Sequence, residues 1–298
     1  MSNPPLNRSG EAKRHLPAPQ PPEPGLNIVS TPIGNLRDIT LRALDALAGA
    51  DRIYAEDTRN ARKLMQAYGL AGRLLAYHDH NGPAVRPEIL AALDAGEAIV
   101  LISDAGTPLV SDPGYKLVKE AVEAGHAVRA LPGASALLTG LAAAGLPSDA
   151  FFFGGFLPAK TGARRSRLKT FETIPGTLIV YETGPRITAA LQDVATVLGD
   201  RDVVMARELT KKFEEFRRGN ASELAAHYLE AGPPKGEITL LIGPGEAETL
   251  TDEEINRQLA QLIPDLGVKG AAALMADSTG LSRRELYQRA QRMKDTSF

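Results

Sequence analysis

The most polar loop of the sequence, SDAGTPLVSDPG (103–114), directly follows the apolar run AIVLI (98–102), which predicts a buried strand. Serine, aspartate, glycine and proline are turn-forming residues, so the loop could be an ordinary connection. It could also bind a small molecule, because open α/β sheets hold their ligands beyond the carboxyl ends of parallel strands. Taken alone, the loop leaves these two interpretations open.

Carboxylates and an arginine follow another predicted strand, in the segment AEDTRNARK (55–63). Glu56, Asp57 and Arg59 would face the same crevice as the first loop if the two strands lie in one parallel sheet. Asp57 or Thr58 is equally suited to cap the following helix, because both are preferred N-cap residues. We therefore expect one of these two to be a cap and leave Glu56 and Arg59 open as site residues.

The segment YHDHNG (77–82) contains the residue types of a metal site. Successive side chains of an extended segment point to opposite faces, so only His78 and His80 would share one side. No third ligand stands at a suitable spacing, and the chain has no cysteine, which excludes disulfides, thiolate nucleophiles and cysteine-ligated metals. We therefore expect no metal.

Small residues are concentrated in two further loops after predicted strands, STPIGNLRDIT (30–40) and LPGASA (131–136). Small residues let a ligand lie against the backbone, although close packing of a helix on a sheet uses them as well. Neither loop contains G-x-G-x-x-G, the dinucleotide-binding pattern expected at the first of these positions. Its absence counts against a nicotinamide-dependent oxidoreductase.

A basic segment, FLPAKTGARRSRLK (156–169), contains no acidic residue. Its cations are Lys160, Arg164, Arg165, Arg167 and Lys169. Because Thr161 and Gly162 favour a mobile loop and the charges have no evident packing role, we predict a polyanion contact, such as RNA phosphates. The last predicted helix carries Arg283 and Arg284, which either belong to a solvated face or contact phosphates.

Alternating strand and helix patterns must position these loops. Strands are predicted at 26–30, 51–56, 73–78, 98–103 and 127–131. A helical pattern follows each of them, which is typical of an α/β domain with a mostly parallel sheet covered on both faces.

A second α/β unit begins near residue 147, and an extra strand at 214–219 would make its sheet mixed. The last helical patterns, joined by STGLS (278–282), resemble a helix-turn-helix. The expected organisation is a disordered proline-rich tail (1–25), two α/β domains (26–146 and 147–245) and a helical unit (246–298).

The chain has 298 residues and a formal net charge of -2, so any nucleic acid must be held by local basic patches. Its apolar runs are shorter than the ~18 residues of a membrane span. The N-terminus lacks the apolar core of a signal peptide, so we expect a cytoplasmic protein.

Taken together and in order, the motifs closely resemble those of the ribosomal RNA small subunit methyltransferase I family, of the tetrapyrrole-methylase superfamily. The motifs are STPIGNLRDIT, AEDTR, HDHN, SDAGTPLVSDPG, LPGASA, GFLPAK, YETGPR, ARELTKKFEE and KGEITLLI. The resemblance runs from Leu26 to Ile242, and SDAGTPLVSDPG and GFLPAK are its most specific motifs. The proline-rich tail is additional to the family pattern.

The resemblance implies two α/β domains with S-adenosylmethionine in the cleft between them, in a homodimer. It also implies a reaction, methyl transfer to the ribose 2′-hydroxyl of cytidine 1402 in the decoding region of 16S rRNA, in the 30S subunit. A sulfonium methyl group is already activated, so the enzyme acts mainly by alignment. A ribose hydroxyl is barely ionised at neutral pH, so a general base would help.

The superfamily pattern implies cofactor contacts in four loops and strand ends: Pro32, Gly34, Asp104, Ala105, Gly106, Thr107, Ser135, Ala136 and Tyr181. The start of the KGEI strand is expected to complete this pocket.

Several strand-end residues could be the base: Glu56, Asp57, His78, Glu182 and Glu208. We single out Glu56 and Glu182. Three arginines, Arg59, Arg186 and Arg207, could hold phosphates or orient carboxylates.

Two other functions remain open on the sequence. A tetrapyrrole or other small-molecule methylase would share the cofactor pocket, but it would need neither the basic segment nor the terminal helices. A non-catalytic RNA- or ribosome-binding protein would bind RNA without transferring a methyl group.

Overall fold

The computed structural model describes residues 17–245, 251–279 and 281–296. The chain divides into two compact units, one ending at Gly245 and the other beginning at Glu246, and each is described by itself. Of the expected disordered tail, residues 1–16 lie outside the described residues. The remainder is tied to the folded body, because the Gln20 amide donates to Asp45 and Arg129 donates to the Pro24 carbonyl.

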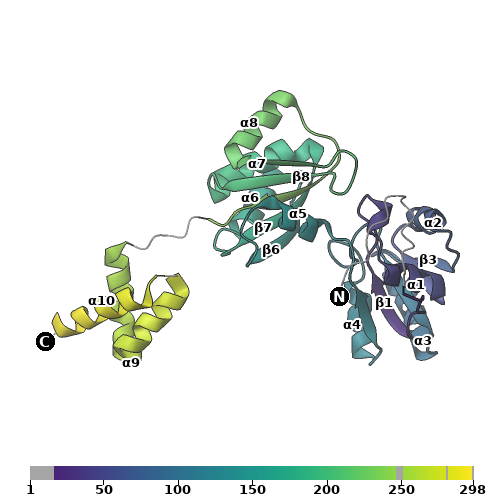
Figure 1. Cartoon of the computed structure of the whole chain (residues 1–298), viewed down its shortest axis with the longest axis horizontal. Coiled ribbons are helices and arrows are strands. Elements are labelled where there is room, and N and C mark those ends of the chain that lie inside the picture. The colour runs from purple at the N-terminus through teal and green to yellow at the C-terminus, as the bar shows by residue number, and fades with distance from the viewer. Residues whose placement is uncertain (1–16, 246–250, 280, 297–298) are drawn as a thin grey trace, which may run out of the picture. The chain divides into compact units, whose positions relative to one another are not determined.

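The first half of the larger unit is built on a parallel five-stranded sheet (Figure 1). Its strands are β1 (Gly25–Val29), β2 (Arg52–Ala55), β3 (Leu74–Ala76), β4 (Ala98–Ile102) and β5 (Val128–Leu131). They lie in the order β3-β2-β4-β1-β5, and every neighbouring pair is parallel. The expected α/β architecture with a parallel sheet is confirmed for this half.

Helices cover both faces of this sheet. They are α1 (Leu41–Gly49), α2 (Thr58–Ala67), α3 (Gly82–Asp94) and α4 (Tyr115–Glu123). The short 3₁₀ helix η1 (Leu36–Asp38) has no buried residue and lies in the loop before α1. Alternate residues of β4 point to opposite faces: Ile99 and Leu101 pack with α3 and α4, and Val100 and Ile102 pack with α1 and α2. Because helices cover both faces of the sheet, every residue of β4 is buried, and its sequence is therefore a continuous apolar run.

The second half has a mixed five-stranded sheet, as the extra strand at 214–219 predicted. Its strands are β6 (Phe151–Phe156), β7 (Thr177–Thr183), β8 (Asp202–Arg207), β9 (Glu215–Asn220) and β10 (Glu237–Ile242). The order is β6-β7-β10-β8-β9, and only the β6–β7 pair is parallel. β10, the last strand among the described residues, therefore lies at the centre of the sheet.

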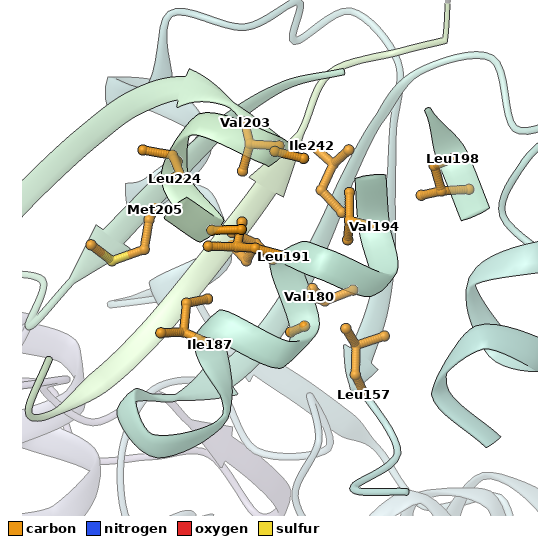
Figure 2. Close-up of a cluster of buried hydrophobic side chains, with 14 of the residues drawn as sticks. Leu157, Val180, Ile187, Leu191, Val194, Leu198, Val203, Met205, Leu224 and Ile242 are labelled. Carbon is orange, nitrogen blue, oxygen red and sulfur yellow. The ribbon is translucent and has the colours of Figure 1, made fainter. Parts of the chain in front are cut away.

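One face of this sheet is covered by α6 (Thr161–Lys169), α7 (Gly184–Leu198) and α8 (Ala221–Ala231). Figure 2 shows the core beneath them, where Leu191 and Val194 of α7 meet Val180, Met205 and Ile242 of the strands. The N-terminus of α8 is a capping box, in which the Asn220 side chain accepts from the Glu223 amide and the Glu223 side chain accepts from the Asn220 amide.

Helix α5 (Ala136–Ala144) covers the opposite face of the second sheet, although it directly follows β5 of the first. Its side chains Leu137, Leu141 and Ala144 pack against Ile179 of β7 and Leu241 of β10. The crossing from one sheet to the other therefore takes place in the loop before α5, at residues 132–135.

The smaller unit is helical, with α9 (Asp252–Thr279) and α10 (Arg283–Thr296). Gly267 has a non-helical backbone (φ 66°), so α9 consists of two helices joined at that residue. The side chains of Leu259, Met275 and Leu286 lie in the core of this unit. Among the described residues, no helix has both the length and the apolar character that crossing a membrane requires.

Candidate functional site

A pocket of about 330 Å³ lies between the two sheets of the larger unit. From the first half it is lined by Ile33, Asp104, Ala105, Gly106, Thr107, Val110, Ser111, Asp112 and Ser135. From α5 and the second half it is lined by Ala136, Phe156, Tyr181, Glu182, Thr183, Ala206, Leu209, Lys211, Glu237, Ile238 and Thr239. We call it the junction pocket.

Sheet topology brings the loops of the first half together. Strands β4, β1 and β5 are parallel neighbours, so the loops after them leave the same edge of the sheet. Backbone hydrogen bonds of 2.9 Å join Thr31 and Gly106 in both directions. The hydroxyls of Ser30 and Thr107 lie 3.0 Å apart, which links the loops further. These bonds join the two loops of the pocket wall to each other.

Two glycines allow this close approach of the loops. A Cβ atom on Gly133 would lie 2.7 Å from the Cβ of Ser30. Gly106 has a φ of +78°, which side-chain-bearing residues rarely adopt. The loop of residues 103–114 also holds Leu109 and Ser111 at φ 73° and 66°. Such conformations cost free energy and persist where the surrounding structure imposes them, often at functional sites.

Three carboxylates are gathered at this edge of the first sheet. Asp104 accepts hydrogen bonds from the Asp57 amide (3.2 Å) and from the Asn60 side chain (2.8 Å). Burial raises the pKa of Asp112 from 3.8 to about 6, a hydrogen bond from Ser103 opposes the rise, and the charges of Glu56 and Asp104 add to it. Burial and the charge of Asp104 also raise the pKa of Glu56.

On the opposite wall, Lys211 lies between two carboxylates. Its ammonium group is 3.0 Å from Glu208 and 2.7 Å from Glu237. Burial alone would lower the pKa of Lys211, but the hydrogen bonds to Glu237 and Glu208 outweigh it, so the pKa is raised. The ammonium group is therefore a fixed positive charge beside the pocket.

Aromatic rings form the wall at the end of β6. Tyr181 contacts Phe153 and Phe156 edge-to-face, with ring centroids 4.9 and 5.4 Å apart. Phe156 lines the pocket and is nonetheless 55 % exposed.

Most of the residues that the sequence predicts to contact a cofactor line the junction pocket: Asp104, Ala105, Gly106, Thr107, Ser135, Ala136 and Tyr181. Pro32 and Gly34 are not among the lining residues, and Ile33 between them is. Gly34 instead packs against Lys211, because a Cβ atom on it would lie 2.4 Å from the Lys211 Cγ.

The predicted base candidates lie in different surroundings. Glu56 follows β2, close to Asp104 and Asp112. Glu182 lines the pocket, but its side chain is 0 % exposed, pairs with Arg186 at 3.0 Å and accepts the Thr183 amide at 2.8 Å. Its second oxygen accepts from Arg186 at 3.1 Å, and burial raises the pKa of Glu182. The role of Glu182 as a base stays a prediction.

The other candidate bases lie in contacts of their own. Asp57 caps α2, as one of the two sequence alternatives proposed, and pairs with Arg59 at 2.6 Å. His78 accepts the Asn81 amide at 3.2 Å, and its ring centroid is 6.0 Å from that of His80. Among the described residues, no group of histidine and acidic side chains has the geometry to hold a metal ion.

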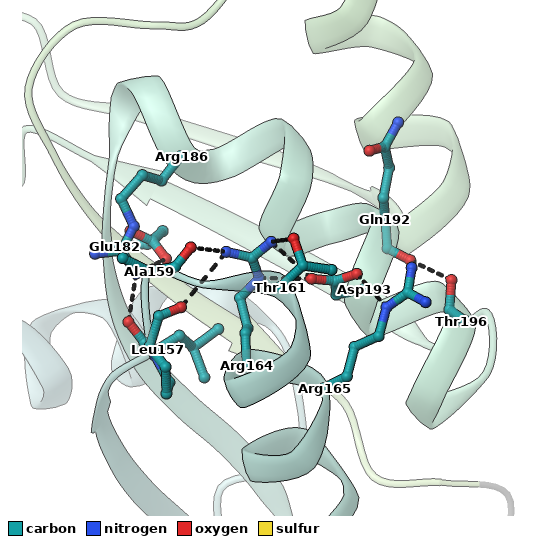
Figure 3. A network of polar contacts seen from close by, with 11 residues as sticks. Leu157, Ala159, Thr161, Arg164, Arg165, Glu182, Arg186, Gln192, Asp193 and Thr196 are labelled. Atoms are coloured by element: carbon teal, nitrogen blue, oxygen red, sulfur yellow. Dashed lines mark hydrogen bonds and ion pairs between the residues drawn. The ribbon is translucent and has the colours of Figure 1, made fainter.

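The basic segment differs from the expected mobile loop, because residues 161–169 form α6. Arg164 is buried, with its guanidinium 2.7 Å from Asp193, and therefore does not face solvent as an RNA contact would (Figure 3). Its partner Asp193 comes from α7, which the basic run itself could not reveal. Arg165 is half exposed and pairs with the same carboxylate at 2.6 Å.

The remaining predicted RNA contacts are exposed: Lys160, Arg167, Lys169, Arg283 and Arg284. Arg167 lies over the ring of Phe171, and Lys169 pairs with Glu172. Asp112, Phe156 and Lys211 line the pocket and were missed from the sequence. Asp112 and Phe156 could have been found, because each lies within one of the two most specific motifs.

Comparisons with known proteins cover both units. Residues 25–225 match the family model described as Tetrapyrrole (Corrin/Porphyrin) Methylases, and residues 249–294 match the model described as RsmI C-terminal HTH domain. A solved uroporphyrin-III C-methyl transferase from Thermus thermophilus, complexed with S-adenyl homocysteine, shares the fold with a TM-score of 0.52 at 22% identity. The match covers 74% of this chain and 97% of that one.

Two curated relatives match along most of their length. The ribosomal RNA small subunit methyltransferase I of Mesorhizobium japonicum is 49% identical over 95% of this chain and 96% of its own. The protein of the same name from Escherichia coli O157:H7 is 48% identical over 89% of this chain and 94% of its own. The chain therefore belongs to the ribosomal RNA small subunit methyltransferase I family, within the tetrapyrrole methylases.

Proposed function

We propose that this chain transfers a methyl group from S-adenosylmethionine to the ribose 2′-hydroxyl of a cytidine in the decoding region of 16S rRNA. The observation that carries the proposal is the junction pocket, whose walls are built from the motifs that the sequence shares with the family. The names of the two relatives support a small-subunit rRNA as the substrate.

The residues of the junction pocket fit S-adenosylmethionine. A volume of about 330 Å³ is in the range of small-molecule sites, which are mostly apolar with a few polar groups. Apolar walls from Ile33, Val110 and Ile238 suit an adenosine and a methionine chain, and Asp104 and Thr107 supply polar contacts. The Thermus thermophilus structure of this fold contains the demethylated cofactor product. When bound, the cofactor supplies a methyl group activated by a positively charged sulfur.

The protein's part in the reaction is alignment and proton removal. Hydrogen bonds between the two loops fix the wall of the pocket, so little ordering is needed when the substrates bind. Glu56 and Asp112 are the carboxylates that we propose as acceptors of the ribose hydroxyl proton. Burial raises the pKa of Asp112 to about 6 and also raises the pKa of Glu56, so each takes up a proton more readily than an exposed carboxylate. Burial raises the pKa of Glu182 as well, but both of its oxygens bind Arg186, so we assign it to holding that arginine.

We propose that RNA contacts Lys160, Arg165, Arg167 and Lys169 at α6, together with Arg283 and Arg284 of the helical unit. Each is an exposed cation on the described surface, and contacts of cations with phosphates supply a large share of nucleic-acid affinity. We further propose that the protein is cytoplasmic, acts as a homodimer and modifies the 30S subunit.

A label-transfer assay tests the proposal. The protein is incubated with methyl-labelled S-adenosylmethionine and either naked 16S rRNA or 30S subunits that lack the modification. Mass spectrometry of nuclease fragments then locates the label. We expect label on one cytidine ribose and a reduced yield with Lys160→Ala and Arg167→Ala. Cofactor binding without transfer to either RNA would instead indicate a small-molecule methylase.

A further inference from the structure

Phe156 is an aromatic side chain that is exposed in spite of its place at the junction pocket. It is the last residue of β6, it lines the pocket, and it is 55 % exposed. Its contact with Tyr181 is edge-to-face, with ring planes 62° apart. Neighbouring residues therefore cover less than half of the surface of Phe156. A ring left open beside a ligand pocket is suited to stacking.

The strand places this ring by an irregularity. The pairing of β6 with β7 shifts between Phe153 and Phe156, where Gly154 and Gly155 stand opposite a single residue of β7. Gly155 has a φ of +67°, and a Cβ atom on Gly154 would lie 2.8 Å from the ring of Phe171. Irregularities of this kind change the direction of a side chain at the end of a strand.

The backbone after Phe156 is held by two arginines (Figure 3). Arg186 donates to the Leu157 carbonyl and pairs with the buried Glu182. Arg164 donates to the Ala159 carbonyl at 3.1 Å and pairs with the buried Asp193 at 2.7 Å. Two ion pairs therefore fix a turn of three residues. The turn carries the Phe156 ring at one end and the exposed Lys160 at the other.

We infer that Phe156 is a stacking platform for the base of the nucleotide that is methylated. The inference rests on the proposed function and adds a nucleobase subsite to it, at the rim of the junction pocket. RNA enzymes and binding domains commonly stack unpaired bases on aromatic side chains. Lys160, on the same fixed turn, is placed to contact a phosphate of the same strand. Loss of one such stacking contact weakens nucleic-acid binding by about tenfold or more.

The test compares substitutions at the two ends of β6. Phe156→Leu removes the ring, and Phe156→Trp restores an aromatic face. Phe151→Leu is the matched control, because Phe151 begins the same strand, is 45 % exposed and does not line the pocket. Each variant is assayed for methyl transfer to 30S subunits, for binding of S-adenosyl homocysteine, and for binding of a cytidine-containing RNA oligonucleotide in the presence of S-adenosyl homocysteine.

We expect Phe156→Leu to lower kcat/KM for the RNA and the affinity for the oligonucleotide about tenfold. Because Phe156 lines the pocket, affinity for S-adenosyl homocysteine should fall too, but by a smaller factor than affinity for the oligonucleotide. Phe156→Trp should recover most of the loss of RNA binding, and Phe151→Leu should change neither affinity.

Three results would overturn the inference: equal behaviour of Phe156→Leu and Phe151→Leu, a loss confined to S-adenosyl homocysteine binding, or a changed oligomeric state with Phe156→Leu. The last would assign the ring to an interface between copies of the chain. Absence of transfer by the unmodified protein would contradict the proposed function, and the oligonucleotide measurement would still decide the role of Phe156.

Discussion

Two single residues shape the junction pocket in different ways: Asp112 lines it, and Gly34 packs against Lys211, which also lines it. Asp112 is a carboxylate whose ionised form is disfavoured by burial and by its acidic neighbours. Gly34 lacks a side chain where the first loop meets Lys211 across the pocket. The sequence marks both residues as parts of motifs. The sequence could not indicate that Gly34 meets Lys211, which is distant along the chain, or that Asp112 is buried enough to raise its pKa.

Replacing Asp112 with asparagine should stabilise the protein in a pH-dependent way. The folded-state pKa of about 6 lies above the ordinary 3.8, so the folded state binds a proton more tightly than the unfolded state. Stability therefore falls as pH rises between these values, and the cost is complete above pH 6. Asp112→Asn should raise the free energy of unfolding at pH 8 by up to about 3 kcal/mol, and by about half of that at pH 5.

Urea denaturation at the two pH values measures this difference. Asp149→Asn is the control, because Asp149 is an exposed carboxylate. A gain in stability that does not change between pH 5 and pH 8 would contradict the assignment of the raised pKa.

Gly34→Ala should disturb the approach of the first loop to the second half. The new Cβ would lie 2.4 Å from the Lys211 Cγ and 3.0 Å from the Thr210 hydroxyl, so one side must shift. Such overpacking costs about 1–3 kcal/mol, and affinity for S-adenosyl homocysteine should fall with it because Lys211 lines the pocket.

Thermal unfolding and calorimetric titration of the Gly34→Ala variant measure both effects. In the control variant Gly162→Ala, a Cβ atom would have open space around it. Equal results for the two variants would show that the loop tolerates a side chain.

At the scale of elements, periodicity predicted the strands and helices of the first half and their parallel arrangement. It could not predict that α5 covers the second sheet, because the apolar faces of helices look alike whichever sheet they meet. It was wrong about residues 161–169, since a run of arginines was interpreted as a free basic loop. The missing information was Asp193 on α7, which neutralises Arg164 within the fold.

Arg164→Ala should therefore act as a core substitution. It leaves Asp193 buried with one half-exposed partner and removes donors from the Ala159 carbonyl, so we expect a loss of about 3 kcal/mol in the free energy of unfolding. Arg165→Ala removes a half-exposed charge from the same carboxylate and should cost within about 1 kcal/mol.

Denaturant titration of both variants separates these roles. Equal and small losses would indicate that Arg164 is held no more firmly than a surface side chain.

At the scale of the whole molecule, positive charge is concentrated in a few surface regions, although the protein as a whole is slightly negative. The net charge of -2 conceals exposed cations on α6 and in the helical unit. The helical unit has its own core, formed by α9 and α10. Composition could therefore exclude a generally basic RNA-binding protein. It could not show which cations remain available after the ion pairs within the fold have formed.

A chain ending at Gly245 should keep the junction pocket and lose part of its RNA affinity. Every lining residue of the pocket lies before Gly245, so affinity for S-adenosyl homocysteine should stay within about twofold. RNA affinity should fall, and the slope of log Kd against log salt should decrease, because fewer phosphates are neutralised. The full-length variant with Arg283→Ala and Arg284→Ala is the control and should reproduce part of that decrease. An unchanged salt slope in both would exclude the helical unit from RNA contact.

The central position of β10 has a consequence for synthesis on the ribosome. Strands β6 to β9 are synthesised first. β7 and β8 do not pair with each other, because β10 lies between them and pairs with both. β10 also brings Glu237, Ile238 and Thr239 to the pocket. A nascent chain that has reached only β9 therefore has all the cofactor loops of the first half without a closed pocket. Translation must pass β10 before the pocket can close.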